Sequence, residues 1–235
     1  MVPSTSHDQV MGDGAPDLRN EMKAGTKLGH DALDTFFQGK FLHSQMTIAD
    51  YADLLKVLYG MLEPLERVAH NKAKELGLPV DLEGRKRTHL ILEDLEVLGV
   101  APPLTNDLMV TLPAMDTEAQ VMGVLYVLEG SVMGGKTIIR ESRAALGDEI
   151  DGATAFFEGR TLKEVDLISY EEQLRLNAER FNEFRTSLRG FTKNPLKIKR
   201  AINSAKATFK LLKLHATAWI GEHRPELLQD EAAGA

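Results

Sequence analysis

The segment from Val121 to Ile139 constrains the fold more than any other part of this chain, because it is apolar on nearly every side. A helix with that pattern has to be buried over most of its surface. Four glycines nevertheless interrupt it: Gly123, Gly130, Gly134 and Gly135. An interior glycine destabilises a helix by roughly 0.5–1 kcal/mol relative to alanine, so a compensating reason is expected.

Two reasons for these glycines are open at this point. Small residues let two helices pack closely, or they let a helix bend and bring its backbone near a ligand. Gly130 and Gly134 lie one turn apart on one face, and the adjacent pair Gly134-Gly135 weakens the helix locally. This arrangement favours a bent helix over a planar ligand.

The rest of the chain also has helical periodicity, and no segment has convincing strand alternation. We therefore predict an all-α fold, and no linker is long or polar enough to divide it. Residues 1–16 are expected to be a disordered tail, residues 17–221 one domain, and residues 222–235 a flexible tail. The predicted helices run from Asp17 to about Phe37, Thr47 to about Leu76, Glu83 to Leu98, Thr117 to about Leu146, Lys163 to about Phe191, and Pro195 to about Ile220.

Composition excludes several kinds of chemistry. The 235 residues include no cysteine, which rules out disulfides, thiolate catalysis, iron–sulfur clusters and Cys-ligated haem. A net charge of -7 argues against a general nucleic-acid binder. No apolar run is long enough to cross a bilayer, and the polar N-terminus does not resemble a secretory signal, so a cytoplasmic location without membrane contact is expected.

His30 is the candidate metal ligand. It falls on the apolar stripe of the first helix, and Lys23 and Lys27 precede it by two turns and one turn. A neutral imidazole is a good axial ligand for iron, and two ammonium groups nearby could pair with the carboxylates of a haem edge. A core histidine beside two solvated lysines explains the same spacing, and His30 alone does not decide between these readings.

Several motifs together resemble the haem oxygenase family, most closely its bacterial branch. The segment from Met22 to His30 is similar to the family's opening pattern, and Tyr126-Val127-Leu128-Glu129-Gly130-Ser131 looks like the Tyr-Val-Leu-Glu-Gly-Ser of bacterial members. The stretch from Arg85 to Gly99 and the late segment Ala205-Lys206-Ala207-Thr208-Phe209 agree as well. The likeness covers roughly residues 18–219.

This resemblance implies a helical bundle that holds haem b between a proximal and a distal helix. His30 would be the proximal iron ligand, Lys23, Lys27 and Arg185 would contact the propionates, and Gly130 and Gly134 would be the distal glycines. Phe209 and Tyr126 would belong to the pocket. The implied reaction converts haem, O2 and electrons from a reduced ferredoxin or an NAD(P)H-linked reductase into biliverdin, carbon monoxide and ferrous iron.

Two positions depart from the family pattern. Ser131 stands where animal-type enzymes place an aspartate that organises water, so Ser131 is expected to take part in a modified distal network. Gly29, just before the ligand, is unusual inside a helix and is expected to loosen the proximal side.

Other functions remain open. A haem carrier or sensor without turnover would share every ligand feature. A di-iron site would need Glu-x-x-His pairs, which the seven histidines lack, and a thiaminase-like enzyme would need a cysteine. A bilin-binding phytochrome is a possible product acceptor. The acid-free run from Lys193 to Lys213 is either a solvated face or a docking site for an acidic electron donor such as a ferredoxin or flavodoxin.

Overall fold

The computed structural model describes residues 18–80, 83–104, 107–159, 169–191 and 193–229. Within these ranges the chain is helical and contains no strand, which confirms the all-α prediction. The elements are α1 (Leu18–Lys40), α2 (Ile48–Glu75), the 3-10 turn η1 (Glu83–Arg85), α3 (Thr88–Val97), α4 (Glu118–Leu146), η3 (Gly147–Ile150), α5 (Ala155–Glu158), α6 (Tyr170–Phe191), α7 (Pro195–His223) and α8 (Glu226–Gln229).

Local capping fixes the starts of the long helices. The Thr47 hydroxyl accepts from the Asp50 backbone amide while the Asp50 carboxylate accepts from the Thr47 backbone amide, and these two hydrogen bonds form a capping box at the start of α2. The Thr117 hydroxyl caps α4 by accepting from the backbone amide of Gln120. Asn194 caps α7, where Pro195 occupies the first turn as expected.

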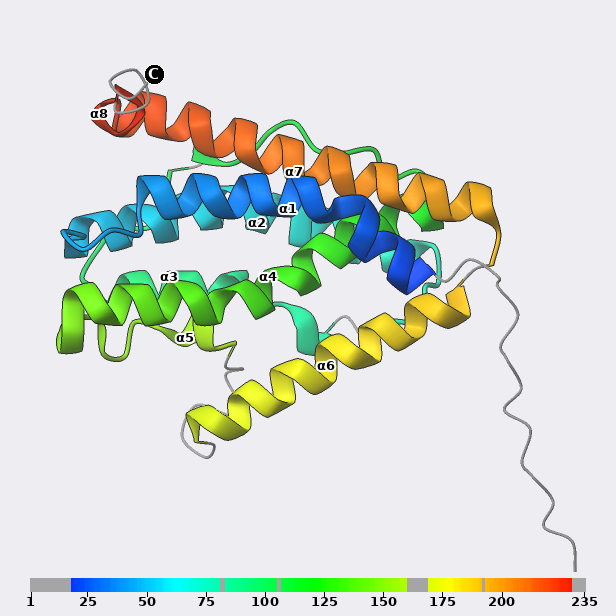
Figure 1. Cartoon of the computed structure of the whole chain (residues 1–235), viewed down its shortest axis with the longest axis horizontal. Helices are drawn as coiled ribbons and strands as arrows, with labels where there is room; N and C mark the ends of the chain where they lie inside the picture. The colour runs from blue at the N-terminus through cyan, green and yellow to red at the C-terminus, as the bar shows by residue number, and fades with distance from the viewer. Residues whose placement is uncertain (1–17, 81–82, 105–106, 160–168, 192, 230–235) are drawn as a thin grey trace, which may run out of the picture.

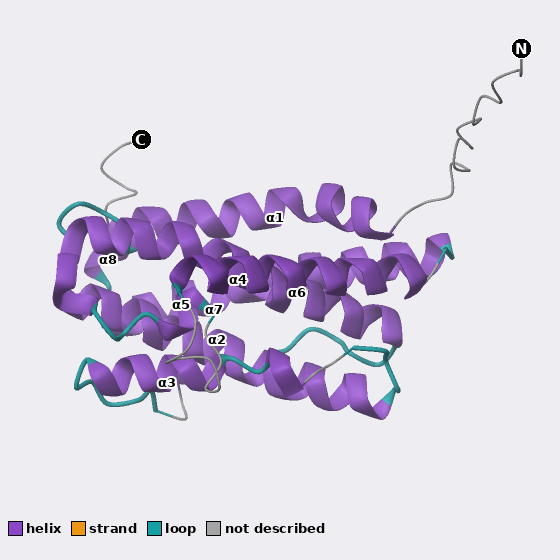
Figure 2. Ribbon diagram, turned by 90° about the horizontal axis from the view of Figure 1, so that it is seen from below, coloured by secondary structure: helices purple, strands orange, loops and turns teal. Residues whose placement is uncertain are grey.

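Helix α7 is the central packing element. It packs along α1 and along α4, whereas α1 and α4 make no extended contact with each other within the described residues. Figure 1 shows α1 and α7 running side by side, and it shows that α4 changes direction partway along its length. In Figure 2, α1 lies on one side of the molecule and α2 with α3 on the other, with α4 and α6 between them.

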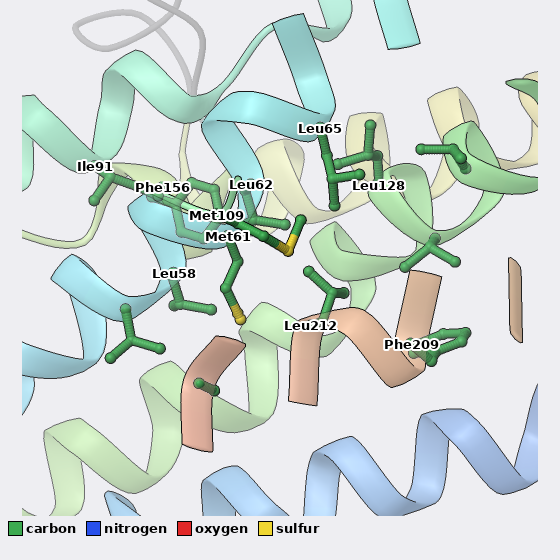
Figure 3. Packing of buried hydrophobic residues seen from close by; sticks show 14 of the residues in the cluster. Leu58, Met61, Leu62, Leu65, Ile91, Met109, Leu128, Phe156, Phe209 and Leu212 are labelled. Atoms are coloured by element: carbon green, nitrogen blue, oxygen red, sulfur yellow. The ribbon is translucent and has the colours of Figure 1, made fainter. Parts of the chain in front are cut away.

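One hydrophobic core joins these helices. Figure 3 shows side chains of α2, α4 and α7 entering the same interior space, among them Met61, Leu128 and Leu212. Each of the three side chains is at most 7% exposed. The core therefore fixes the relative positions of the helices that carry the expected site.

The prediction of one helix from Glu83 to Leu98 was wrong, because the chain breaks between η1 and α3. The carboxylate of Glu66 on α2 accepts from the Arg87 amide at 2.8 Å and from the Thr88 hydroxyl at 2.7 Å, so it caps α3 from outside. Two residues of η1 and its following loop, Arg85 and Arg87, thereby turn toward α4.

Asp94 explains part of the motif between Arg85 and Gly99. Its side chain is fully buried in α3, and its carboxylate accepts from the backbone amides of Ala155 at 2.8 Å and Phe156 at 3.0 Å. It thus caps the short helix α5. Burial raises the pKa of the Asp94 carboxyl to about 7.

The C-terminal end differs from the expected flexible tail. Helix α7 continues to His223, and Arg224 donates to Asp53 at 2.6 Å and to Asp50 at 2.7 Å, which ties it to the start of α2. Helix α8 follows, and the Lys40 ammonium donates to the Leu227 carbonyl at 2.8 Å. These contacts order the chain beyond residue 222, where sequence alone placed a frayed end. Residues 230–235 and the expected N-terminal tail lie outside the described residues.

Candidate haem site

His30 lies on α1 with half of its side chain exposed, so it is not the buried core histidine that the sequence left open. Its Nδ1 is 3.1 Å from Oδ2 of Asp34, one turn further along the helix, and 3.7 Å from Oδ1 of Asp31. The Asp34 pKa is raised, chiefly by burial, although the neighbouring His30 opposes this. The geometry engages one ring nitrogen and leaves Nε2 as the atom available to a ligand.

Phe209 of α7 is the aromatic neighbour of His30. The two ring centroids are 6.0 Å apart at an interplanar angle of 68°, and Phe209 is 8% exposed. This contact confirms that α1 and α7 bring two of the predicted site residues together.

Gly29 is explained by the same contact. A Cβ added at Gly29 would stand 3.1 Å from the Cβ of Phe209, and one added at Gly25 would stand 2.7 Å from a methyl carbon of Ile202. The two glycines therefore let α1 approach α7 closely. Gly29 tightens this contact, which corrects the expectation that it loosens the proximal side.

The glycines of α4 divide into two classes. A Cβ at Gly123 would lie 2.3 Å from the Ala201 carbonyl oxygen, and one at Gly135 would lie 2.6 Å from the Phe157 carbonyl oxygen. Both positions are thus required by packing. A Cβ at Gly130 or Gly134 would meet no atom within 4 Å, so close helix packing does not explain these two glycines.

Ser131 is tied to the backbone of its own helix. Its hydroxyl donates to the Leu128 carbonyl at 2.6 Å and accepts from Nη2 of Arg87 at 3.2 Å. The same Arg87 nitrogen donates to the Leu128 carbonyl at 3.1 Å. Extra donors on a helix carbonyl, including a serine hydroxyl, favour bending, which agrees with the change of direction of α4 in Figure 1.

A buried ion pair stands next to these contacts. Nη1 of Arg85 lies 2.5 Å from Oε2 of Glu129, and both side chains are only 9% exposed. Burial lowers the pKa of Arg87, despite the opposing influence of Glu129 and Glu66, and burial also raises the pKa of Glu129. The resemblance had singled out this Arg-Lys-Arg segment without giving it a role in the site.

The remaining predicted residues are spread over three helices. Lys23 and Lys27 are exposed on α1, and the Lys27 ammonium contacts the Asp31 carboxylate. Tyr126 is half-buried against the core, and the Arg185 guanidinium lies over the Phe181 ring of α6, 5.6 Å from its centroid. That Arg185 and Tyr126 share one site with His30 stays a prediction.

Asp34 is the residue that sequence reasoning missed. The signal was present, because Asp34 follows His30 by four positions and a helix brings such pairs together. Arg87 could not have been found in this way, since its contact with Ser131 joins segments far apart in the sequence.

Among the described residues, no helix combines the length and the apolar character that crossing a membrane requires. Comparison with curated proteins gave no match. Two solved structures share the fold. One is the NO- and CO-bound heme oxygenase from Neisseria meningitidis, at 18% identity and a TM-score of 0.61, covering 88% of this chain and 94% of that one.

The other is the heme oxygenase from Leptospira interrogans, at 19% identity and a TM-score of 0.60, covering 86% of this chain and all of that one. A family model described as heme oxygenase matches residues 16–214. Since this match spans most of the chain and the fold agrees with it, the protein belongs to the haem oxygenase family.

Proposed function

We propose that this protein cleaves haem oxidatively to biliverdin, carbon monoxide and ferrous iron, using O2 and electrons from an external donor. Family membership supports haem as the substrate. The observation that carries the proposal is the half-exposed imidazole of His30, held through Nδ1 by Asp34. A histidine that binds iron commonly donates its other ring N–H to a carboxylate.

The surroundings of His30 on the proximal side suit a histidine that binds iron. The Asp34 carboxylate favours a proton on Nδ1, which leaves the lone pair on Nε2. Phe209 packs against the edge of the imidazole and restricts its rotation. The role of this pair is to hold one tautomer and one orientation of His30.

The distal side fits a flat macrocycle. The space in front of Gly130 and Gly134 is open, and glycine at both positions lets the helix backbone come close to a planar ligand. Backbone groups of this segment would then crowd one side of the substrate and orient it. Ser131 would stabilise the backbone of this segment and would not donate to the substrate, because its hydroxyl already donates to the Leu128 carbonyl.

The lysines of α1 fit the anionic edge of haem. Lys23 and Lys27 are exposed and lie on the turns before His30. Lys27 contacts Asp31, but an exposed ion pair of this kind contributes little stability. Lys27 could therefore leave Asp31 and pair with a haem propionate at a small cost in free energy. We assign these two lysines, together with Arg185, to the in-plane orientation of the substrate.

Bound haem supplies the iron at which O2 is activated and the porphyrin carbon that is oxidised. The protein contributes orientation, shielding from water and electrostatics. Electrons would come from a reduced ferredoxin or an NAD(P)H-linked reductase, and the exposed basic residues of α7 offer a surface for an acidic donor.

Reconstitution with haem tests the proposal. The haem complex is mixed with ascorbate or a reductase in air, and absorbance is followed while the product is extracted and identified. We expect the Soret band to disappear as biliverdin absorbance grows. A complex whose Soret band persists under these conditions would instead be a haem carrier or sensor.

A further inference from the structure

Arg87 contacts the distal segment of α4 from outside that helix. Its Nη2 donates to the Leu128 carbonyl at 3.1 Å and to the Ser131 hydroxyl at 3.2 Å. These two acceptors belong to residues on either side of Gly130 in the sequence, and a Cβ at Gly130 would meet open space. One guanidinium nitrogen therefore holds α4 both before and after this glycine.

Two neighbouring elements fix the position of Arg87 itself. The carboxylate of Glu66 on α2 accepts from the Arg87 backbone amide at 2.8 Å. The guanidinium lies over the Phe156 ring of α5, 5.7 Å from its centroid. A guanidinium that is both stacked on a ring and hydrogen-bonded loses most of its freedom to rotate. Because its backbone and its guanidinium are both restrained, Arg87 can restrain α4 in turn.

The hydrogen bonds of Arg87 act where α4 is intrinsically weak. Gly130 and Gly134 lower the stability of the helix interior. The Leu128 carbonyl accepts from Arg87 and also from the Ser131 hydroxyl, at 2.6 Å. Hydrogen bonds from a charged donor are stronger than those between neutral groups. Arg87 therefore favours one position of the Gly130 backbone over the others that a glycine-containing helix can adopt.

We propose that Arg87 is a positioning residue that determines which edge of haem the distal segment leaves open to oxidation. This inference rests on the proposed function, in which the backbone around Gly130 crowds one side of the macrocycle. A small shift of that backbone changes the relative free energies of attack at the different meso carbons. Arg87 acts through the Leu128 carbonyl and Ser131, and it sets the regiochemistry together with the residues that orient the propionates.

The ratio of bilin isomers tests this role. Haem complexes of the wild type, Arg87→Met and Ser131→Ala are turned over with ascorbate or a reductase, and the isomers are separated by chromatography. We expect both variants to change the ratio by about threefold or more, in the same direction. Arg224→Met is the matched control and should keep the wild-type ratio, because Arg224 stabilises the fold through Asp50 and Asp53 of α2.

The outcomes separate positioning from other effects. Loss of stability alone does not change the ratio, because all isomers arise from the same folded complex. A change in Arg87→Met without a change in Ser131→Ala, which keeps the arginine charge, would mean that this charge acts through space, and it would overturn the positioning role. Equal ratios in all four proteins would overturn it as well. If Arg87→Met does not fold, Arg87→Lys, which loses the planar guanidinium, takes its place with the same expected direction.

A vibrational measurement tests Arg87 without turnover. The Fe–CO stretching band of the ferrous CO complex depends on the groups that face the bound CO. We expect this band to shift or broaden in Arg87→Met and Ser131→Ala and to stay unchanged in Arg224→Met. Wild-type bands in all variants would overturn the proposal. Shifted bands in a protein that forms no bilin would refute the proposed function and still support Arg87 as the residue that positions the distal segment.

Discussion

Nδ1 of His30 lies 3.1 Å from Oδ2 of Asp34, one turn along the same helix. This spacing makes Asp34 a positioning residue for the imidazole, because it selects the tautomer and restrains the ring. Asp31, 3.7 Å from the same nitrogen, is already in contact with Lys27. The two acids therefore have different expected effects on haem binding.

Asp34→Ala should weaken haem binding about 10- to 100-fold and lower the iron–histidine stretching frequency, because the imidazole loses its restraint and its basicity. Asp31→Ala is the matched control and should leave both quantities near the wild-type values. Haem titration and resonance Raman spectroscopy of the ferrous complex measure them. Identical spectra for the two variants would remove Asp34 from this role.

The adjacent glycines Gly134 and Gly135 should respond in opposite ways to alanine. Gly134→Ala should keep or raise Tm, since its Cβ meets open space, yet it should weaken haem binding about tenfold or more. Gly135→Ala places a Cβ 2.6 Å from the Phe157 carbonyl oxygen and should cost about 1–3 kcal/mol of stability. Calorimetry and haem titration separate the two effects. Unfolding of Gly134→Ala at a lower temperature than Gly135→Ala would contradict this division.

Asp94 should make stability fall as pH rises. Its pKa is 3.8 in ordinary surroundings and about 7 in the folded protein, so the folded state binds the proton more tightly between these values. The free energy of unfolding should therefore decrease from pH 4 to pH 7 by up to about 1.4 kcal/mol per pH unit from this group. The difference between wild type and Asp94→Asn, measured by denaturant unfolding across this range, isolates the contribution. A difference that does not change with pH would contradict the raised pKa.

The exposed lysines of α7 should contribute to the binding of an acidic electron donor. Lys206 and Lys210 flank Phe209 in sequence and are exposed. The double variant Lys206→Glu, Lys210→Glu should raise KM for an acidic ferredoxin at low salt while turnover with ascorbate stays unchanged. Lys74→Glu, on α2, serves as the control. Equal KM values in the double variant and the control would indicate that these lysines are only a solvated face.

The parts of the fold that depend on neighbouring residues were predictable from sequence. Thr47, Thr117 and Asn194 cap their helices through contacts within three residues, and the helices begin where the sequence indicated. The break before α3 was not predictable, because its cap is Glu66 of another helix. The same reason explains the ordered C-terminal end, which depends on Arg224 reaching α2.

The candidate site shows the same difference between features that depend on nearby residues and features that depend on distant ones. The sequence identified His30 and the glycine segment, because ligand type and helix-breaking residues are visible locally. It could not assign Gly123 and Gly135 to packing and Gly130 and Gly134 to open space, since that depends on which helix lies opposite each one. The reason for a glycine at position 29 was likewise not visible in the sequence, because it is the close contact with Phe209 of α7.

The central claim is that His30 binds the iron of a haem substrate through Nε2. The most direct test is the electronic spectrum of the His30→Ala haem complex, with and without added imidazole. The account predicts that the histidine-ligated spectrum and biliverdin formation are lost in the variant, and that imidazole restores the spectrum by filling the vacated position. An unchanged Soret band and ligand-field bands in His30→Ala without imidazole would contradict it.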